Sequence, residues 1–272
     1  MSEQRALVDL HCHLVPAVDD GAESLETAIE TLRSFRDSSI VRVVTTPHLD
    51  ARDVGTTRHA RIELAFRALE KAAAEHVPEV ELELAYEIRI DDPEIDLSDR
   101  ELGLSGGGAI LVEFSRLALP AYSSRMLDVV REQEWIPVLA HPERYAGVEA
   151  SYETIERWRG MGALMCVNVG SLLGEYGREP QRVARRMLVD GQVDLLGSDH
   201  HARPHRSTLL RRGYDLLAEV GDPRFTEAAR LLTEANPRAV LEGERITPVP
   251  ALDLPSGWFD RVRRKLLGGG SR

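Results

Sequence analysis

Cysteine is nearly absent from this sequence: only Cys12 and Cys166 occur among its 272 residues. So few cysteines exclude a disulfide-stabilised fold and favour a reducing compartment. They also exclude a thiolate phosphatase, which needs an arginine six positions after the reactive cysteine, because Val18 and Leu172 stand at those positions. We therefore expect both cysteines to be small, buried packing residues.

Long apolar segments and excess basic charge are also missing. No segment approaches the roughly 20 apolar residues of a membrane-spanning helix, and residues 1–5 lack the apolar run of a signal peptide. The formal net charge of −11 argues against nucleic acid as a partner. A glycine-rich phosphate loop of the Walker type is absent, which excludes an ATP-driven protein of that kind. We expect a cytoplasmic globular protein with a large core.

Short apolar segments alternate with helical patterns along the chain. Apolar residues recur at helical spacing, as at Ala28, Ile29, Leu32 and Phe35. The pattern predicts helices at 24–35, 57–76, 122–134, 152–159, 179–190, 208–220 and 225–235. It predicts seven strands, the first running into residues 11–13 and the others at 41–46, 80–90, 109–114, 136–140, 164–169 and 193–197.

The crossovers between these strands are long enough for parallel pairing. Near-continuous apolar strands, such as the one at 109–114, suit a sheet that is covered on both faces. We therefore predict an α/β fold, a distorted parallel (β/α)7 barrel. An open doubly wound sheet is the alternative.

Residues able to bind a metal follow the predicted strands at their carboxyl ends. His11 and His13 flank Cys12 in an extended segment, so their side chains point to the same side. Imidazole is the commonest metal ligand in proteins. In a parallel barrel the carboxyl ends of all strands meet at one face, where active sites are assembled. The candidate ligands are His11, His13, Asp20, His48, Glu87, Glu113, His141, Asp199 and His201.

Four other histidines do not fit this pattern. We interpret His59, His76 and His205 as surface residues. In an extended segment the His200 side chain points to the opposite side from Asp199 and His201. We therefore expect it to support the site or face the substrate rather than bind metal.

Taken together, these motifs resemble the polymerase and histidinol phosphatase (PHP) superfamily, and most closely its bacterial manganese-dependent tyrosine-protein phosphatases of capsule and exopolysaccharide loci. The motifs, in family order, are DLHCH at 9–13, VDDG at 18–21, TPH at 46–48, EIR at 87–89, EF at 113–114, AHPER at 140–144, Asn168 with SLLG at 171–174 and YG at 176–177, and SDHH at 198–201. Two positions depart from the family: Tyr86 stands where a small residue is usual, and Ser115 where proline is common.

The resemblance implies three divalent metal ions, with Glu87 bridging two of them. The implied groups are His11, His13, Glu87 and Asp199 for the first ion, Glu87, Glu113 and His141 for the second, and Asp20, His48 and His201 for the third. Mixed imidazole and carboxylate ligation suits manganese, iron or zinc. The family favours manganese.

The resemblance also implies hydrolysis of a phosphate monoester by a metal-bound hydroxide, without a phosphoenzyme. Arg144 is the expected phosphate-binding residue, because a guanidinium binds two oxygens in parallel. A surface ion pair with Glu143 is the alternative for Arg144. Arg203 and Arg206 are further candidates for binding the phosphate.

The expected function is a metal-dependent protein-tyrosine phosphatase acting on the tail of a membrane-associated tyrosine kinase that controls capsule or exopolysaccharide synthesis. A phenolate leaving group, with a pKa of about 10, needs less help from a general acid than an alkoxide; Asp19 and His200 are candidates for that role. The alternatives are a small-molecule phosphatase of the histidinol phosphate type, a nuclease-like phosphoesterase and a non-catalytic scaffold. The net charge disfavours the nuclease, and the complete ligand set disfavours the scaffold. The sequence predicts neither a monomer nor an oligomer.

The composition changes after residue 246. We predict a phosphatase domain at 1–246, followed at 247–272 by a proline-containing linker and a basic amphipathic segment. In that segment Trp258, Phe259 and Val262 share one helical face, and arginine and lysine residues occupy the rest. Such a segment favours weak contact with an anionic membrane surface, or a final helix that docks on its own barrel. We expect residues 268–272 to be a disordered end.

Overall fold

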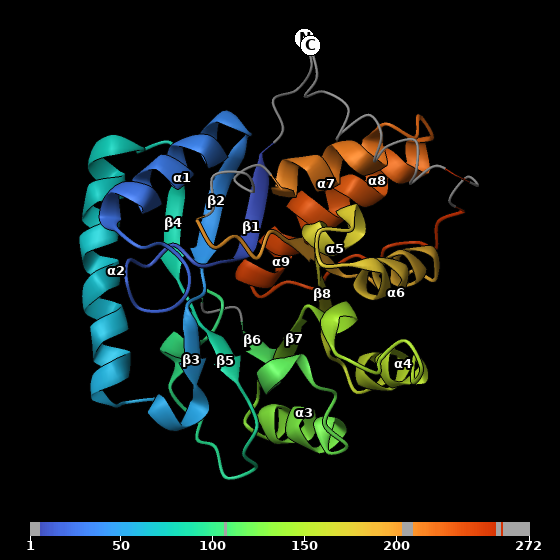
Figure 1. Ribbon diagram of the computed structural model, residues 1–272, viewed down its shortest axis with the longest axis horizontal. Helices are drawn as coiled ribbons and strands as arrows, with labels where there is room; N and C mark the ends of the chain where they lie inside the picture. The colour runs from blue at the N-terminus through green and yellow to red at the C-terminus, as the bar shows by residue number, and fades with distance from the viewer. Residues whose placement is uncertain (1–5, 106–107, 203–208, 254–256, 258–272) are drawn as a thin grey trace.

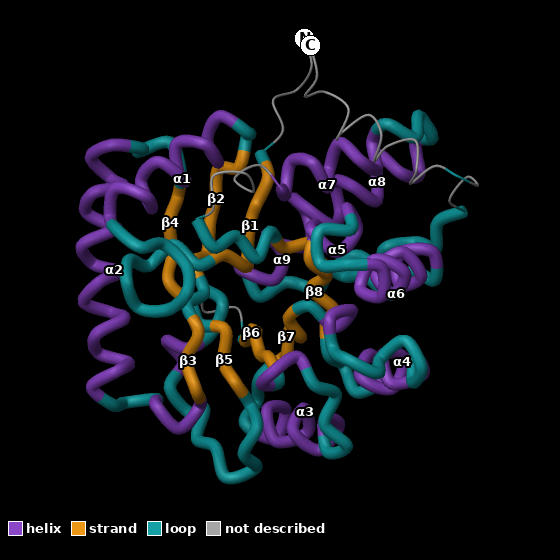
Figure 2. The backbone as a smooth tube through the Cα atoms, in the orientation of Figure 1, coloured by secondary structure: helices purple, strands orange, loops and turns teal. Residues whose placement is uncertain are grey.

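The computed structural model describes residues 6–105, 108–202, 209–253 and 257. In this part of the chain, parallel strands lie at the centre and helices surround them (Figures 1 and 2). No helix among these residues is both long enough and apolar enough to cross a membrane.

The strands are short and the helices vary widely in length. The strands are β1 (Leu7–Cys12), β2 (Ile40–Thr45), β3 (His48–Asp50), β4 (Glu81–Leu84), β5 (Glu87–Arg89), β6 (Ala109–Glu113), β7 (Ile136–Ala140), β8 (Leu164–Asn168) and β9 (Leu195–Gly197). The helices are α1 (Leu25–Asp37), α2 (Thr57–His76), α3 (Ser123–Glu132), α4 (Glu153–Gly160), α5 (Val169–Leu173), α6 (Arg178–Val189), α7 (Leu209–Ala218), α8 (Pro223–Arg230) and α9 (Asn236–Leu241).

Two of the predicted strands are interrupted. β2 ends before residues 46–47 and pairing resumes at β3, because Pro47 has no N–H to donate. The neighbouring predicted strand, at 80–90, is interrupted at residues 85–86, between β4 and β5. Hydrogen bonds across the break, from the N–H of Ala85 to the carbonyl of Thr45 (3.0 Å) and from the N–H of Glu87 to the carbonyl of Pro47 (3.2 Å), keep the two strands in register. β2 with β3, and β4 with β5, therefore each act as one strand.

The strand pairings follow one another around a ring. The sheets run in the orders β1-β2-β4 and β3-β5-β6-β7-β8-β9, and every pair is parallel. The segment after β9 returns to β1, since the N–H of Asp199 donates to the carbonyl of His11 and the N–H of His13 donates to the carbonyl of His200, both at 2.8 Å. The predicted fold class, a distorted parallel α/β barrel, is confirmed. β1 and β9 belong to separate sheets, and these two backbone hydrogen bonds connect them.

Side chains are buried on both faces of the strands. Val8, Leu10 and Val138 belong to a cluster that fills the space between the strands and includes Val240 and Leu241 of α9, and a larger cluster lies between the strands and the other helices. Each helix covers the sheet with an apolar stripe, as α1 does with Ile29 and Phe35. The Ser24 hydroxyl begins α1 by accepting a hydrogen bond from the N–H of Thr27 (3.1 Å).

Three elements were not predicted from the sequence: the short strand β3 and the helices α5 and α9. In α9, Pro237 lies in the first turn, where proline is tolerated. The connection from β5 to β6 contains no α-helix among the described residues, only a 3-10 turn at Arg100–Leu102.

The start of the predicted C-terminal segment lies against the barrel. Thr247 exchanges hydrogen bonds with the Asn236 side chain at 2.9 and 3.0 Å, and Val249 and Leu252 are buried. The division of the chain at residue 246 stays a prediction. Residues 258–272, with the predicted basic amphipathic segment, lie outside the described residues.

Candidate metal centre

The nine candidate ligands come together at the carboxyl ends of the strands. In the described part of the chain, possible ligand atoms form three groups, and the atoms within each group lie within 4.8 Å of one another. The groups are His13, Asp20, His48 and His201; His11, His13 and Glu87; and His48, Glu87 and Glu113. The remaining two candidates border these groups, because His141 Nε2 lies 2.8 Å from Glu87 Oε1 and Asp199 Oδ1 lies 3.5 Å from the Nε2 atoms of both His11 and His13.

Glu87 lies at the middle of the cluster. Its carboxylate is fully buried and four imidazoles face it. The nitrogen–oxygen distances are 2.8 Å for His141, 3.0 Å for His48, 3.3 Å for His11 and 3.4 Å for His13. One carboxylate with two oxygens can bridge two cations, so this placement suits the bridging role predicted for Glu87.

Several ligand atoms in this cluster are buried without a hydrogen-bond partner. Among the described residues these orphaned atoms include His11 Nε2, His13 Nε2, His48 Nδ1 and Glu87 Oε2, which approach one another without forming hydrogen bonds. Buried polar atoms without a partner are costly, and native proteins satisfy most of them. The convergence of unsatisfied imidazole nitrogens and carboxylate oxygens fits a site for divalent cations.

The protonation states reflect this crowding of opposite charges. Burial opposes the charged form of Glu87, but the surrounding imidazoles outweigh it and lower the pKa of Glu87 well below its usual value. Burial likewise opposes protonation of His48, yet the carboxylates of Glu113 and Glu87 raise its pKa to about 10. Without a cation His48 therefore takes up a proton, so protons and metal compete for its ring nitrogens.

Asp19 orients His13. Its Oδ2 lies 2.8 Å from His13 Nδ1, and its oxygens accept hydrogen bonds from the N–H groups of Gly21 (3.0 Å) and His48 (3.1 Å). Burial raises the pKa of Asp19, but the His13 and backbone hydrogen bonds overcome it and lower that pKa to about 2. These contacts fix the His13 ring with Nε2 toward Glu87. A low pKa does not favour Asp19 as a general acid, and that role stays a prediction.

Asn168 and Asp9 also support the cluster, although the sequence predicted no role for either in it. The Asn168 amide donates to Asp199 Oδ2 at 2.7 Å. Asp9 Oδ1 accepts hydrogen bonds from the N–H groups of His11 (3.3 Å) and Ser198 (3.2 Å), which ties the end of β1 to the end of β9. Both stand within the quoted motifs, but their roles depend on contacts between segments far apart in the sequence.

The backbone is strained at two of the candidate ligands. His141, after β7, has φ +37°, and Asp199, after β9, has φ +50°. Residues other than glycine rarely adopt this left-handed region, and such strain gathers at functional sites. These turns direct both side chains back toward the centre of the ring.

Arg144 turns into the site instead of toward Glu143. Its Nη1 donates to Asp199 Oδ2 at 2.6 Å, its guanidinium lies 4.1 Å from the centre of the Tyr176 ring, and its side chain is 19% exposed. Glu143 is buried and accepts a hydrogen bond from the N–H of Asn168. The alternative of a surface ion pair with Glu143 is not found. Arg203 and Arg206 lie outside the described residues.

Arg89 is a second cation beside the cluster, and no role was predicted for it. Its Nη2 lies 3.4 Å from Glu113 Oε1, and its side chain is 36% exposed. Arg89 stands two positions after Glu87 in β5, so both side chains point to the same side of the strand. This spacing could have indicated Arg89 from the sequence.

The other histidines agree with expectation only in part. His200 is fully buried, with its ring centre 5.4 Å from that of Phe35 on α1, which fits the expectation that it supports the site and not the alternative that it faces the substrate. It is absent from the three groups of possible ligand atoms. His59 is also buried, with its ring edge against Tyr86 at 4.9 Å between centres, because α2 turns it toward the strands. His76 is exposed as predicted, and His205 lies outside the described residues.

Both cysteines are buried, as predicted. Burial raises the pKa of the Cys12 and Cys166 thiols well above the usual value. Neither thiol is therefore a nucleophile at neutral pH.

Comparison with known proteins connects this geometry to one family. The chain is 28% identical to the tyrosine-protein phosphatase YwqE of Bacillus subtilis over 269 residues, which cover 96% of this chain and 99% of YwqE. It is 24% identical to the tyrosine-protein phosphatase CpsB of Streptococcus pneumoniae over 247 residues, which cover 88% of this chain and 100% of CpsB.

A solved structure shares the fold as well. It comes from crystal structures of YwqE and CpsB, which are described as unique metal-dependent tyrosine phosphatases, and it matches with a TM-score of 0.76 and 26% identity over 91% of this chain and 100% of the other. The family model for capsular polysaccharide synthesis, CpsB/CapC, matches residues 7–242. The chain belongs to the CpsB/CapC family, a branch consistent with the PHP superfamily.

Proposed function

We propose that this protein is a metal-dependent protein-tyrosine phosphatase, a phosphoric monoester hydrolase. The observation that carries the proposal is the cluster of buried, unpartnered ligand atoms around Glu87. The names of YwqE and CpsB as tyrosine-protein phosphatases support the choice of reaction.

We assign the cluster to three divalent ions, with manganese as the metal. The groups His11, His13, Glu87 and Asp199; Glu87, Glu113 and His141; and Asp20, His48 and His201 would hold one ion each. Divalent ions in such a site lower the pKa of water and neutralise the charge of phosphate oxygens. The mixture of imidazole and carboxylate ligands suits manganese, iron or zinc, and disfavours calcium and magnesium, which prefer oxygen.

The protein's own side chains bind and orient the substrate. Arg144 donates to phosphate oxygens from the edge of the cluster, where Asp199 and Tyr176 fix its guanidinium. Arg203 and Arg206 are proposed as further phosphate-binding residues. A phenolate with a pKa of about 10 leaves readily, so the proposed reaction does not depend on a general acid.

The proposed substrate is phosphotyrosine in the tail of a membrane-associated tyrosine kinase of a capsule or exopolysaccharide locus. The name of the family, capsular polysaccharide synthesis, supports this context. We place the phosphatase in the cytoplasm, with the phosphatase domain at 1–246 and weak contact between the basic C-terminal segment and the membrane surface.

The test of this function compares two phosphate monoesters. We expect kcat/KM to be at least about 100-fold higher for a phosphotyrosyl peptide than for histidinol phosphate, which corresponds to roughly 2.7 kcal/mol of transition-state stabilisation. Both rates are measured as phosphate release by the manganese-loaded protein. A preference for histidinol phosphate would support the small-molecule phosphatase instead.

Arg144→Lys is expected to lower kcat/KM for a phosphotyrosyl peptide by about 10- to 100-fold, because an ammonium cannot reproduce the bidentate guanidinium fork. Metal content should stay unchanged, since lysine keeps the positive charge next to Asp199. Steady-state kinetics measures the fall in kcat/KM, and elemental analysis of the same samples measures the metal content. Arg182→Lys is the matched control, as Arg182 pairs with Glu149 on the surface. An unchanged rate in Arg144→Lys would remove Arg144 from phosphate binding.

A further inference from the structure

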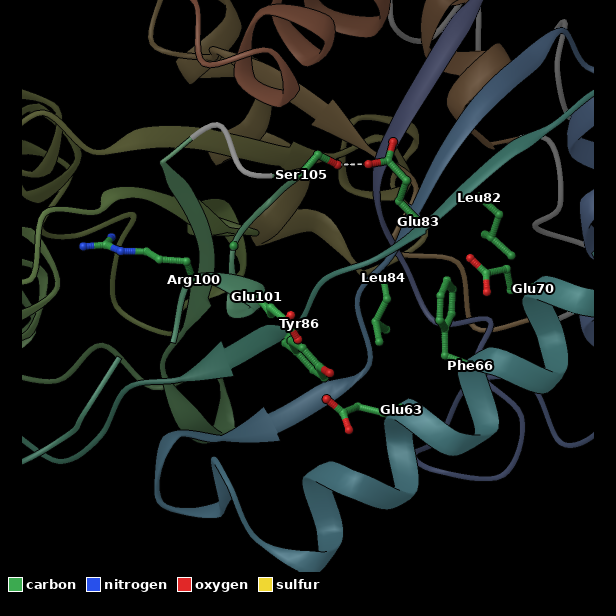
Figure 3. A pocket seen from close by; sticks show the side chains of 11 residues that line it. Glu63, Phe66, Glu70, Leu82, Glu83, Leu84, Tyr86, Arg100, Glu101 and Ser105 are labelled. Atoms are coloured by element: carbon green, nitrogen blue, oxygen red, sulfur yellow. Dashed lines mark hydrogen bonds between the residues drawn. The ribbon is translucent and has the colours of Figure 1, made fainter. Parts of the chain in front are cut away.

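A groove lies on the outside of the barrel between α2 and β4 (Figure 3). Its volume is about 530 Å³, and residues 100–105 close its far side. The groove exists because residues 90–105 and 108 supply no α-helix to cover this part of the wall before β6 begins. We call it the acidic groove.

Four carboxylates line the groove, and three of them have no partner among the described arginine and lysine residues. Glu63 and Glu70 project from α2, and Glu101 comes from the opposite side. The fourth, Glu83, pairs with Arg42 at 2.6 Å. Among the described residues none of the three forms an ion pair with arginine or lysine; only His59 approaches Glu63, at 4.0 Å. Arg100 also borders the groove, but its guanidinium lies 4.6 Å from the centre of the Trp135 ring and 3.4 Å from Glu134, pointing away in Figure 3.

A largely buried tyrosine side chain lies among these carboxylates. Tyr86 is only 2% exposed and lines the groove, and its hydroxyl forms no hydrogen bond with any described residue. Figure 3 shows it pointing toward Glu63. Burial, and then the charges of Glu63, Asp99 and Glu101, raise the pKa of Tyr86 above its usual value. The phenol therefore remains neutral and can accept a hydrogen bond from a cationic donor.

The rest of the groove is apolar. Phe66 from α2 and Leu82 and Leu84 from β4 line it beside the carboxylates. Arginine and lysine side chains have an apolar stem and a charged end, and they bury the stem while the end meets polar groups. A buried metal ion would instead need several ligand atoms close together, and no such group was found among the described residues of this groove.

We propose that the acidic groove binds an arginine or lysine side chain from a basic segment of a protein partner. The identity of that partner rests on the proposed function, in which it is the phosphoprotein substrate. Tyr86 and Glu87 are consecutive residues on opposite faces of the barrel wall, so the groove and the metal centre share one strand. A substrate with basic residues away from its phosphotyrosine then contacts both.

Binding is tested first without any phosphate. The probe is a fluorescent, arginine-rich peptide that contains no tyrosine, and its affinity for the full-length protein is measured by anisotropy. We expect Glu63→Gln/Glu70→Gln/Glu101→Gln to weaken binding about tenfold, and Glu70→Gln alone to weaken it less. Glu75→Gln is the matched control, because Glu75 is exposed on the same helix but does not line the groove. Equal affinity of the triple variant and the control would overturn the proposal.

Turnover is tested with two phosphotyrosyl peptides that differ only in an arginine-rich extension. The extension should lower KM for the natural protein and not for the triple variant, while hydrolysis of a small aryl phosphate stays the same in both. If no phosphotyrosine compound is hydrolysed but the arginine-rich peptide still binds through the groove, the proposed function fails and the groove assignment stands. If deletion of residues 256–272 tightens peptide binding severalfold, the chain's own basic segment occupies the groove, and the assignment to a partner is overturned.

Discussion

Glu87→Gln is expected to abolish phosphatase activity and to lower the metal content at the same time. The Glu87 carboxylate faces four imidazoles in a fully buried position, and both of its oxygens lie within 3.4 Å of a histidine nitrogen. Glutamine keeps the shape but removes the negative charge and places an N–H₂ group against ligand nitrogens. We expect kcat/KM to fall by more than about 100-fold, the upper end of the loss when a residue that only supports a ligand is changed.

Elemental analysis and phosphotyrosyl peptide kinetics on the same purified samples measure this effect. His76→Ala is the control, because His76 is an exposed histidine at the end of α2. It should change neither quantity. Equal losses in the two variants would show that the separation of ligands from surface histidines is incorrect. Loss of activity with full metal content would assign Glu87 to catalysis and not to metal binding.

The candidate ligands were predictable because a simple rule places them. Parity along an extended strand puts His11 and His13 on one side, and a parallel barrel brings all the carboxyl ends to one face. The same alternation kept His200 out of the predicted ligand set, and its ring packs against Phe35. Helical periodicity was similarly reliable for α2, whose predicted range of 57–76 matches the structure.

The supporting contacts were not predictable, since they join residues far apart in the sequence. The hydrogen bond between Arg144 and Asp199 spans 55 positions, and the one between Asp19 and the N–H of His48 spans 29. Neither has a local sequence signal. His59 was misjudged for a related reason: Tyr86 lies beneath α2 and contacts its ring. The strand break at Pro47 was visible in the sequence, but the continued pairing beyond it depends on the neighbouring strand.

Metal removal should have the broadest effect. We expect a chelator to abolish hydrolysis of a phosphotyrosine mimic, and manganese to restore it more effectively than magnesium. Five of the nine candidate ligands are histidines, which magnesium binds poorly because it prefers oxygen ligands and retains its water. Because His48 has a pKa raised to about 10 without a cation, protons compete with the metal. Manganese should therefore bind more tightly at alkaline than at neutral pH.

Stability should change together with activity. A ligand present at 100 times its dissociation constant stabilises the folded state by about 2.7 kcal/mol per site, which for a domain of this size raises Tm by roughly 5–10 °C. Calorimetry of chelated and manganese-loaded samples, with metal content measured in both, checks this. Without cations, the orphaned atoms around Glu87 are only partly compensated by proton uptake at His48. A sample shown to be free of metal that keeps full activity and an unchanged Tm would disprove the metal centre and leave the nine converging side chains as a purely structural network.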